Sequence, residues 1–101
     1  MTMITFINVF TVQPEAQSDA LQNILQVYTE VVKQQPGFRG AKLLKSSDGT
    51  RVTAIAYWES EADLQAMRST PGFKALHTPE FYAAIVSNDG HVYNQGIDIE
   101  K

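Results

Sequence analysis

Apolar residues on alternating positions predict strands over residues 3–12 and 51–59. In the first segment, the residues on one face are Ile4, Phe6, Asn8, Phe10 and Val12. The opposite face of this segment is also largely apolar. In the second segment apolar residues again lie on both faces, and the only tryptophan of the chain, Trp58, lies at its end. Strands with two apolar faces need to be covered on both sides.

Apolar residues at helical spacing predict a helix that begins at residues 14–15, since proline and an acidic residue are favoured in a first turn. The members of its apolar stripe are Leu21, Ile24, Leu25, Tyr28, Val31 and Val32. The Pro-Gly pair at 36–37 ends the helix. A strand over 38–45 then leads into Asp48-Gly49, a hairpin turn signal, and the chain returns as the strand 51–59.

A second helical region begins after Ser60, which starts a capping-box-like sequence. It covers about 61–68, is interrupted at 69–72, and continues with residues at a spacing of four: Phe73, His77 and Phe81. Because Pro79 disfavours a helical residue before it, we expect a break one residue after His77. The segment from about 91 to 99 is predicted to be the final strand.

The predicted order of elements is βαββαβ, the order of the split-βαβ or ferredoxin-like fold. We therefore expect one α+β domain over residues 1–101, with a four-stranded antiparallel sheet and both helical regions on one face. The helices leave the other apolar face of the sheet uncovered. We expect that face to form a homodimer, sheet against sheet.

Composition supports a packed domain and excludes several functions. No segment approaches the roughly 20 apolar residues of a membrane span, and no basic residue precedes the first apolar run, so we expect a cytoplasmic protein without membrane contact. The absence of cysteine excludes disulfides, zinc–thiolate sites and cysteine nucleophiles. A net charge of −3 with scattered basic residues makes nucleic-acid binding an improbable function.

Few residues are available for chemistry. The sequence has no nucleophile elbow, H-E-x-x-H, EF-hand loop, P-loop or dinucleotide fingerprint, so we expect no metal or nucleotide site. Three residues stand out on apolar faces: Asn8, Trp58 and His77. Each alone is most simply explained as a core or hydrogen-bonded residue. Together they could line one apolar cleft with a few polar groups, which would suit a flat aromatic ligand.

Four segments occur in a particular order: FINVFTV followed by Pro-Glu, PGFRG at 36–40, SDGT at 47–50 and YWESEA at 57–62. Together they make the chain similar, over nearly its whole length, to the antibiotic biosynthesis monooxygenase family of small dimeric ferredoxin-like proteins. The resemblance is fairly specific for the fold family and much less so for the substrate.

One branch of this family oxidises polycyclic phenols to quinones with molecular oxygen and no cofactor. The resemblance implies a substrate that is deprotonated and then donates an electron to oxygen. Trp58 matches the tryptophan of that branch, but Ala54 and Leu64 stand where it has an asparagine and a tyrosine. A similar mechanism would need other donors or bases, and those available are Asn8, Tyr57, Tyr82 and His77.

Another branch degrades haem and uses an asparagine in the first strand, a tryptophan in the second helix and a proximal histidine in the next. Asn8 and His77 match the first and third of these, whereas Met67 replaces the tryptophan. The resemblance therefore implies haem as an alternative cofactor, with His77 as axial ligand. The loss of the tryptophan weakens the case for ring opening more than that for binding.

Our leading hypothesis is a cofactor-independent monooxygenase that oxidises a small aromatic, phenol or quinol substrate. His77 is the expected proton acceptor, and Asn8 and Trp58 are expected to line the pocket with it. The expected substrate contacts are Phe6, Tyr57, Met67, Phe73, Phe81 and Tyr82. Two alternatives remain open: a haem-binding or haem-degrading protein, and a non-catalytic dimeric module that binds a small ligand.

Overall fold

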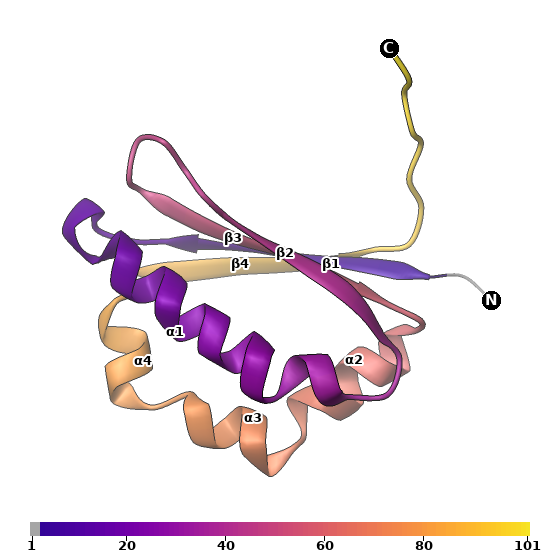
Figure 1. Cartoon of the computed structure of the whole chain (residues 1–101), viewed down its shortest axis with the longest axis horizontal. Coiled ribbons are helices and arrows are strands. Elements are labelled where there is room, and N and C mark those ends of the chain that lie inside the picture. The colour runs from indigo at the N-terminus through magenta and orange to yellow at the C-terminus, as the bar shows by residue number, and fades with distance from the viewer. Residues whose placement is uncertain (1–2) are drawn as a thin grey trace.

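The computed structural model describes residues 3–101, in which a four-stranded antiparallel sheet carries all of its helices on one face (Figure 1). The strands are β1 (Ile4–Thr11), β2 (Phe38–Lys45), β3 (Arg51–Trp58) and β4 (Ser87–Tyr93), in the spatial order β2-β3-β1-β4. The helices are α1 (Gln17–Glu30), α2 (Glu61–Arg68), α3 (Pro71–Leu76) and α4 (Pro79–Ala83), with short 3-10 helices η1 (Pro14–Ala16) and η2 (Val32–Gln34). The predicted ferredoxin-like plan is confirmed, with the second helical region divided into three helices.

The core lies between the sheet and the helices. Antiparallel pairing of β1 with β3, from Ile4 opposite Trp58 to Thr11 opposite Arg51, places the same face of both strands toward the helices. The largest side chains that are fully buried there are Trp58, Ile24, Leu64, Val32 and Val52. The period-two pattern of the sequence therefore identified the buried face correctly.

Gln17 fastens the start of α1 to the β2–β3 hairpin. It is the only buried polar side chain within residues 3–101, and its Nε2 donates to the carbonyl oxygens of Ser46 at 2.9 Å and Arg51 at 3.0 Å. Both bonds compensate the burial of the amide. The helix and the hairpin thus meet in one fixed orientation.

The turn between β2 and β3 is organised by the carboxylate of Asp48. It accepts hydrogen bonds from Ser46 Oγ at 2.8 Å, from the backbone N–H of Thr50 at 3.0 Å and from Thr50 Oγ1 at 2.7 Å. Gly49 follows with φ of 82°, a backbone conformation that glycine adopts without strain. The hydrogen bonds from Thr50 and Ser46 lower the pKa of Asp48 from 3.8 to about 2.

Replacing Asp48 by alanine is expected to remove a contribution to stability that depends on pH. Because the pKa is lowered on folding, this contribution is present above about pH 4 and is lost as the pH falls to about 2. Urea unfolding of wild type and Asp48→Ala should therefore differ at neutral pH and converge toward pH 2. The control is Asp98→Ala, which removes a carboxylate outside the turn. A difference that stays constant with pH would contradict the assignment.

The helices after β3 all begin at a hydroxyl side chain. In each, the N-cap oxygen accepts from the backbone N–H three residues later, at 3.1 to 3.2 Å, and the caps are Ser60, Thr70 and Thr78. Thr78 is extended, with ψ of 168°, and Pro79 starts α4. The expected break one residue after His77 is confirmed, and it leaves His77 as the C-terminal cap of α3.

The final strand differs from the prediction. β4 covers Ser87–Tyr93 instead of 91–99, and residues 94–101 have no regular structure. The apolar alternation after residue 91 resembles a strand, but β1 can pair only along its own length, from Thr11 opposite Ser87 to Thr5 opposite Tyr93. The prediction was wrong because polar residues at 87–90 are tolerated in an edge strand when its neighbour supplies the hydrogen bonds.

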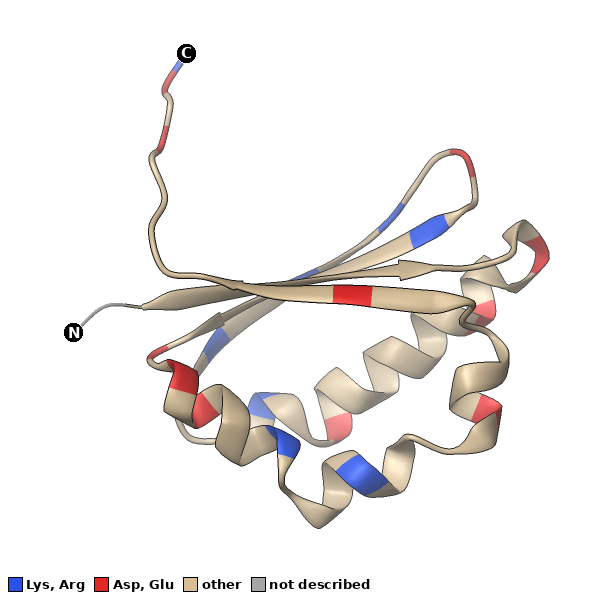
Figure 2. Ribbon diagram, turned by 180° about the vertical axis from the view of Figure 1, so that it is seen from behind, with Lys and Arg blue, Asp and Glu red and all other residues tan. Residues whose placement is uncertain are grey.

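The face of the sheet away from the helices has no cover within residues 3–101 (Figure 1). Its apolar side chains are Ile7, Val9, Leu44, Ile55, Tyr57 and Tyr93. Residues 94–101 extend from β4 on this same side, and Ile97 and Ile99 are each 91% exposed. Basic and acidic residues are interspersed over the elements (Figure 2). No helix of the described residues has the length and apolarity to cross a membrane.

Candidate functional site

A cavity lies between the inner face of the sheet and the helices. Its lining residues are Phe6, Asn8, Phe10, Ile24, Val27, Tyr28, Val32, Trp58, Leu64, Met67, Arg68, Phe73, His77 and Phe81. About 60 Å³ of it is open to the centres of water molecules. One water needs roughly 10–15 Å³ on this measure, so the cavity has room for a few waters or a small ring. Its lining combines an apolar majority with a few polar groups, as ligand sites do.

The structure brings the three singled-out residues together, because Asn8, Trp58 and His77 all line this one cavity. They come from β1, β3 and the end of α3. Four of the expected substrate contacts line it as well: Phe6, Met67, Phe73 and Phe81. The cleft proposed from the sequence is therefore present.

The other two expected substrate contacts do not line the cavity. Tyr57 precedes Trp58 on β3, and the period of two turns its side chain to the uncovered face, where it is exposed. Tyr82 is 52% exposed on α4, with its ring centroid 5.9 Å from that of His77. It stands beside His77 outside the lining, while its neighbour Phe81 is buried.

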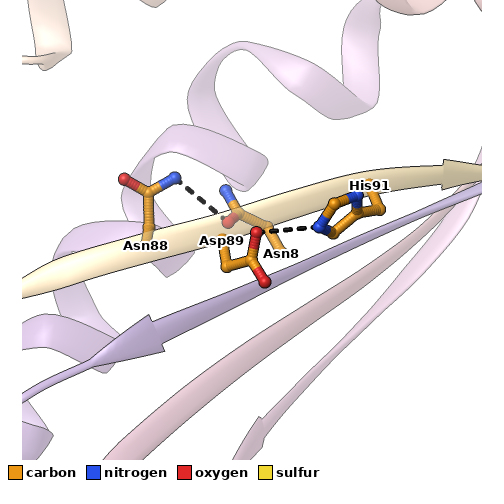
Figure 3. Close-up of polar contacts among 4 residues, drawn as sticks. All are labelled: Asn8, Asn88, Asp89 and His91. Atoms are coloured by element: carbon orange, nitrogen blue, oxygen red, sulfur yellow. Dashed lines mark hydrogen bonds and ion pairs between the residues drawn. The ribbon is translucent and has the colours of Figure 1, made fainter.

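Asn8 is held by the neighbouring strand β4. Its Oδ1 accepts a hydrogen bond from Asn88 Nδ2 at 3.2 Å (Figure 3). This contact leaves the amide nitrogen of Asn8 as a donor. On the same strand, His91 and Asp89 pair with each other at 2.8 Å and are both exposed. His91, the second histidine of the chain, thus has no part in the cavity.

Because Gly90 has no side chain, it leaves room for the side chains of Asn8 and Phe6. It lies opposite Asn8 in the pairing of β1 and β4. A Cβ atom added there would stand 2.9 Å from Phe6 Cζ and 3.3 Å from Asn8 Cγ. Contacts this short require one of those side chains to shift. The sequence analysis did not single out this glycine, whose role follows only from the strand register.

Replacing Gly90 by alanine is therefore expected to displace the side chain of Phe6 or Asn8. Overpacking of this kind costs on the order of 1–3 kcal/mol, so ligand binding should weaken about tenfold or more. The change in fluorescence of Trp58 on adding p-nitrophenol measures the binding. Gly96→Ala is the matched control, because nothing lies within 4 Å of its added methyl group. Equal affinities in both variants would show that Gly90 does not shape the cavity.

Trp58 is fully buried, and its ring packs edge-on against Phe38 with centroids 5.4 Å apart. Its indole Nε1 is the only buried side-chain nitrogen or oxygen within residues 3–101 that has no hydrogen-bond partner. Buried donors of this kind are normally satisfied. In a residue that lines a cavity, a free N–H is available to an acceptor on a ligand.

His77 is clamped between two aromatic rings and oriented by a backbone carbonyl. The ring centroids of Phe73 and Phe81 lie 4.2 Å and 4.6 Å from that of the imidazole. Nδ1 lies 2.6 Å from the carbonyl oxygen of Phe73. Because a carbonyl only accepts, Nδ1 carries the proton, and the lone pair of the neutral ring is on Nε2. His77 can therefore take up a proton at Nε2.

Two lining residues with polar groups were not identified as site residues from the sequence: Tyr28 of α1 and Arg68 at the end of α2. Tyr28 was predicted as a member of an apolar stripe, and Arg68 reads as an ordinary basic residue in a last helical turn. Burial raises the pKa of the Tyr28 hydroxyl to about 12, an effect that the nearby charge of Arg68 partly opposes. Tyr28 is thus a neutral phenol at physiological pH.

Fold and cavity together define a ferredoxin-like α+β protein with an apolar ligand cavity between its sheet and its helices. The chain belongs to the antibiotic biosynthesis monooxygenase family, whose sequence profile matches residues 3–79. It is 39% identical over 69 residues to tetracenomycin-F1 monooxygenase of Streptomyces glaucescens, a match covering 68% of this chain. That match spans 62% of the relative's length, less than two thirds.

Solved structures share the fold across the chain. SnoaB, a cofactor-independent oxygenase from Streptomyces nogalater, superposes with a TM-score of 0.84 at 22% identity, and the match covers 100% of both chains. Rv0793 from Mycobacterium tuberculosis superposes with a TM-score of 0.78 at 18% identity, over 99% of this chain and 100% of the other. At these identities the likeness concerns the fold alone.

Proposed function

We propose that this protein is a cofactor-independent monooxygenase that oxidises a small phenol or quinol with molecular oxygen. The observation that carries the proposal is the convergence of Asn8, Trp58 and His77 on one cavity. Asn8 and Trp58, which line the cavity, each carry an N–H that has no acceptor within residues 3–101, and His77 carries a lone pair at Nε2. Membership of the monooxygenase family supports the reaction class.

In this proposal the protein binds a phenol with its hydroxyl toward His77, and Nε2 takes the proton. The resulting phenolate is electron-rich enough to donate an electron to oxygen. One oxygen atom becomes a new ring carbonyl, the other leaves as water, and the phenol becomes a quinone. The chain's own contribution is to orient the ring, accept the proton and exclude bulk water.

The size of the cavity bears on the substrate. Room for a few water molecules suits a single aromatic ring better than a polycyclic skeleton. The aromatic walls formed by Phe6, Phe73 and Phe81 would stack on such a ring. The proposal is therefore for a smaller substrate than a polycyclic phenol.

Oxygen uptake tests the proposal. Purified protein is incubated with phenol, α-naphthol and hydroquinone in air and under argon, and product quinones are analysed after reaction in isotopically labelled oxygen. One labelled oxygen is expected in the quinone formed from phenol or α-naphthol, and one in the hydroxyquinone formed from hydroquinone. If ligands bind but no oxygen is consumed above the background without protein, the non-catalytic ligand-binding module becomes the better description.

The fit to haem is poor. His77 could offer Nε2 as an axial ligand, since Nδ1 is committed to the Phe73 carbonyl. However, the cavity has space for a few water molecules, whereas haem consists of four pyrrole rings around an iron. The site therefore has a nitrogen that could bind the iron, but the cavity is too small to hold the porphyrin. Haem is not part of the proposed reaction.

We also propose that two copies associate through the uncovered face of the sheet. The apolar residues of that face and the exposed isoleucines of residues 94–101 lie on the same side (Figure 1). An apolar surface of this kind on a small domain marks an association site. A second copy presents the same surface, so a two-fold arrangement would cover both at once.

Replacing Ile7 by lysine is expected to halve the molecular mass in solution, because a charge would be buried in the centre of that interface. Ile7 lies opposite Ile55 in the middle of the sheet. Light scattering after size-exclusion chromatography gives the mass. Leu25→Lys is the matched control, since Leu25 is an exposed leucine on α1. A wild-type protein of monomeric mass, or an Ile7→Lys variant of unchanged mass, would contradict the proposal.

A further inference from the structure

We propose that Arg68 makes this cavity selective for an aromatic anion, so that the substrate is held with an ionised oxygen on or next to its ring. The inference rests on the proposed function, because it names the chemical class of the substrate for the same site. Phenolates and aromatic carboxylates share this chemistry. No sequence pattern marks Arg68 for this role, which depends on the residues that the fold places around it.

Arg68 is positioned at the cavity without a partner for its charge. It lines the cavity and is partly buried, and its Cζ stands 4.8 Å from the centroid of the Phe6 ring. This stacking orients the guanidinium but leaves its N–H donors free. Within residues 3–101 the ion pairs are Arg39 with Glu59 and His91 with Asp89, and neither involves Arg68.

The remaining groups of the cavity cannot neutralise this charge. Its titratable lining residues are Tyr28, Arg68 and His77, and no aspartate or glutamate lines it. Burial keeps the pKa of Tyr28 at about 12, so its hydroxyl stays neutral beside Arg68. His77 is neutral or positive. A partly desolvated cation among apolar walls is stabilised when an anion joins it, and in this cavity that anion has to come with the ligand.

The walls of the cavity favour an aromatic ring in the ligand. Arg68 stands over Phe6, and the cavity is otherwise walled by aromatic and aliphatic side chains. A planar ring that carries one anionic oxygen can place the oxygen on the guanidinium and the ring among these walls. Arginine suits the task because its planar fork donates two parallel hydrogen bonds and stays charged at all relevant pH values.

This arrangement has a consequence for the proposed reaction. A cation within about 4–6 Å of an acidic group lowers the pKa of that group by about 1 to 3. A phenol bound beside Arg68 would therefore ionise more readily than in water. Arg68 would stabilise the phenolate that reacts with oxygen, while His77 receives the proton. In these terms Arg68 is a substrate-binding residue that favours one protonation state.

The first test uses p-nitrophenol, whose phenolate absorbs visible light and so reports its own ionisation. Absorbance is titrated against pH with and without excess protein. In wild type the pKa of the bound ligand is expected to fall by about 1 to 3. Arg68→Gln should abolish the shift, and Arg68→Lys should restore part of it. Lys33→Gln, which removes an exposed lysine that does not line the cavity, should behave as wild type.

The second test compares benzoate with benzamide, which have nearly the same shape and differ by one charge. Quenching of Trp58, the single tryptophan and a lining residue, reports binding of each. Benzoate is expected to bind about tenfold or more tightly than benzamide to wild type, and equally to Arg68→Gln. Circular dichroism shows whether each variant is folded. If Arg68→Gln does not fold, the affinities of wild type and Arg68→Lys for benzoate and benzamide decide whether the site prefers an anion.

The two tests distinguish the sources of the anion and separate this inference from the proposed function. A shift for p-nitrophenol with no preference for benzoate assigns the site to phenolates, and the reverse assigns it to carboxylates. No shift and no preference, or no binding of either probe pair, overturns the inference even if oxygen uptake is observed. Anion selectivity without oxygen uptake upholds the inference and removes the proposed monooxygenase function.

Discussion

Replacing His77 by alanine is expected to reduce the rate of oxygen uptake by about 10²- to 10⁴-fold, the usual contribution of a positioned general base. Of the three titratable side chains in the lining, only the imidazole has a nitrogen lone pair that can accept a proton, since Tyr28 is a neutral phenol and Arg68 has no acceptor atom. Its Nδ1 is committed to the Phe73 carbonyl at 2.6 Å, so Nε2 is the accepting atom. Oxygen-electrode rates with phenol or hydroquinone measure the effect.

Two further variants separate proton transfer from packing. His77→Gln keeps a polar side chain between Phe73 and Phe81 but cannot take up a proton at neutral pH, so it should be as slow as alanine. His91→Ala removes the other histidine, which is exposed on β4 and lies outside the cavity lining, and should leave the rate unchanged. A glutamine variant with wild-type rate would show that His77 only fills space.

Replacing Trp58 by alanine is expected to lower the free energy of unfolding by about 3–5 kcal/mol, a large part of the roughly 5–15 kcal/mol that a domain of this kind has. The side chain is 0% exposed and packs against the ring of Phe38. Its removal leaves a void at the C-terminal end of β3 that the backbone pairing with β1 and β2 cannot close. Urea unfolding followed by circular dichroism measures the loss.

Trp58→Phe is the informative companion to this variant. It keeps most of the ring and deletes the indole N–H, which has no partner within residues 3–101. An unsatisfied buried donor costs about 1–3 kcal/mol, so the phenylalanine variant should lose much less stability than the alanine variant. Because Trp58→Phe has no tryptophan, binding of p-nitrophenol is followed by the absorbance of the ligand itself. If this binding weakens in Trp58→Phe while stability is nearly kept, the N–H serves the ligand. Equal stability losses in both variants would contradict this division.

Local sequence signals were sufficient for the fold. Apolar alternation in 3–12 and 51–59 predicted the two central strands, and the Ser60 cap and Pro79 predicted where helices begin and break. The final strand was misplaced because its position depends on pairing with β1. Pairing between distant segments is decided by the register of the neighbour, which the residues of the strand itself do not encode.

The site was only partly predictable for the same reason. Asn8, Trp58 and His77 stood out because each is a polar or amphipathic residue on an apolar face, a signal that is local. Arg68 and Gly90 carried no such signal, since an arginine in a last helical turn and a glycine in a polar segment are ordinary. Their roles arise from what the fold places beside them, the Phe6 ring in both cases.

The sequence by itself determined the order of elements, the buried face of each central strand and the polar residues that point into the interior, because periodicity and capping act over a few neighbouring residues. Only the tertiary structure decided that those residues share one cavity, that Tyr57 and Tyr82 stand outside it, and that an unpaired Arg68 faces into it. These facts depend on how β1, β3 and the three short helices pack together. Packing brings together residues that are far apart in the chain, and it thereby determines the charge and the size of the site.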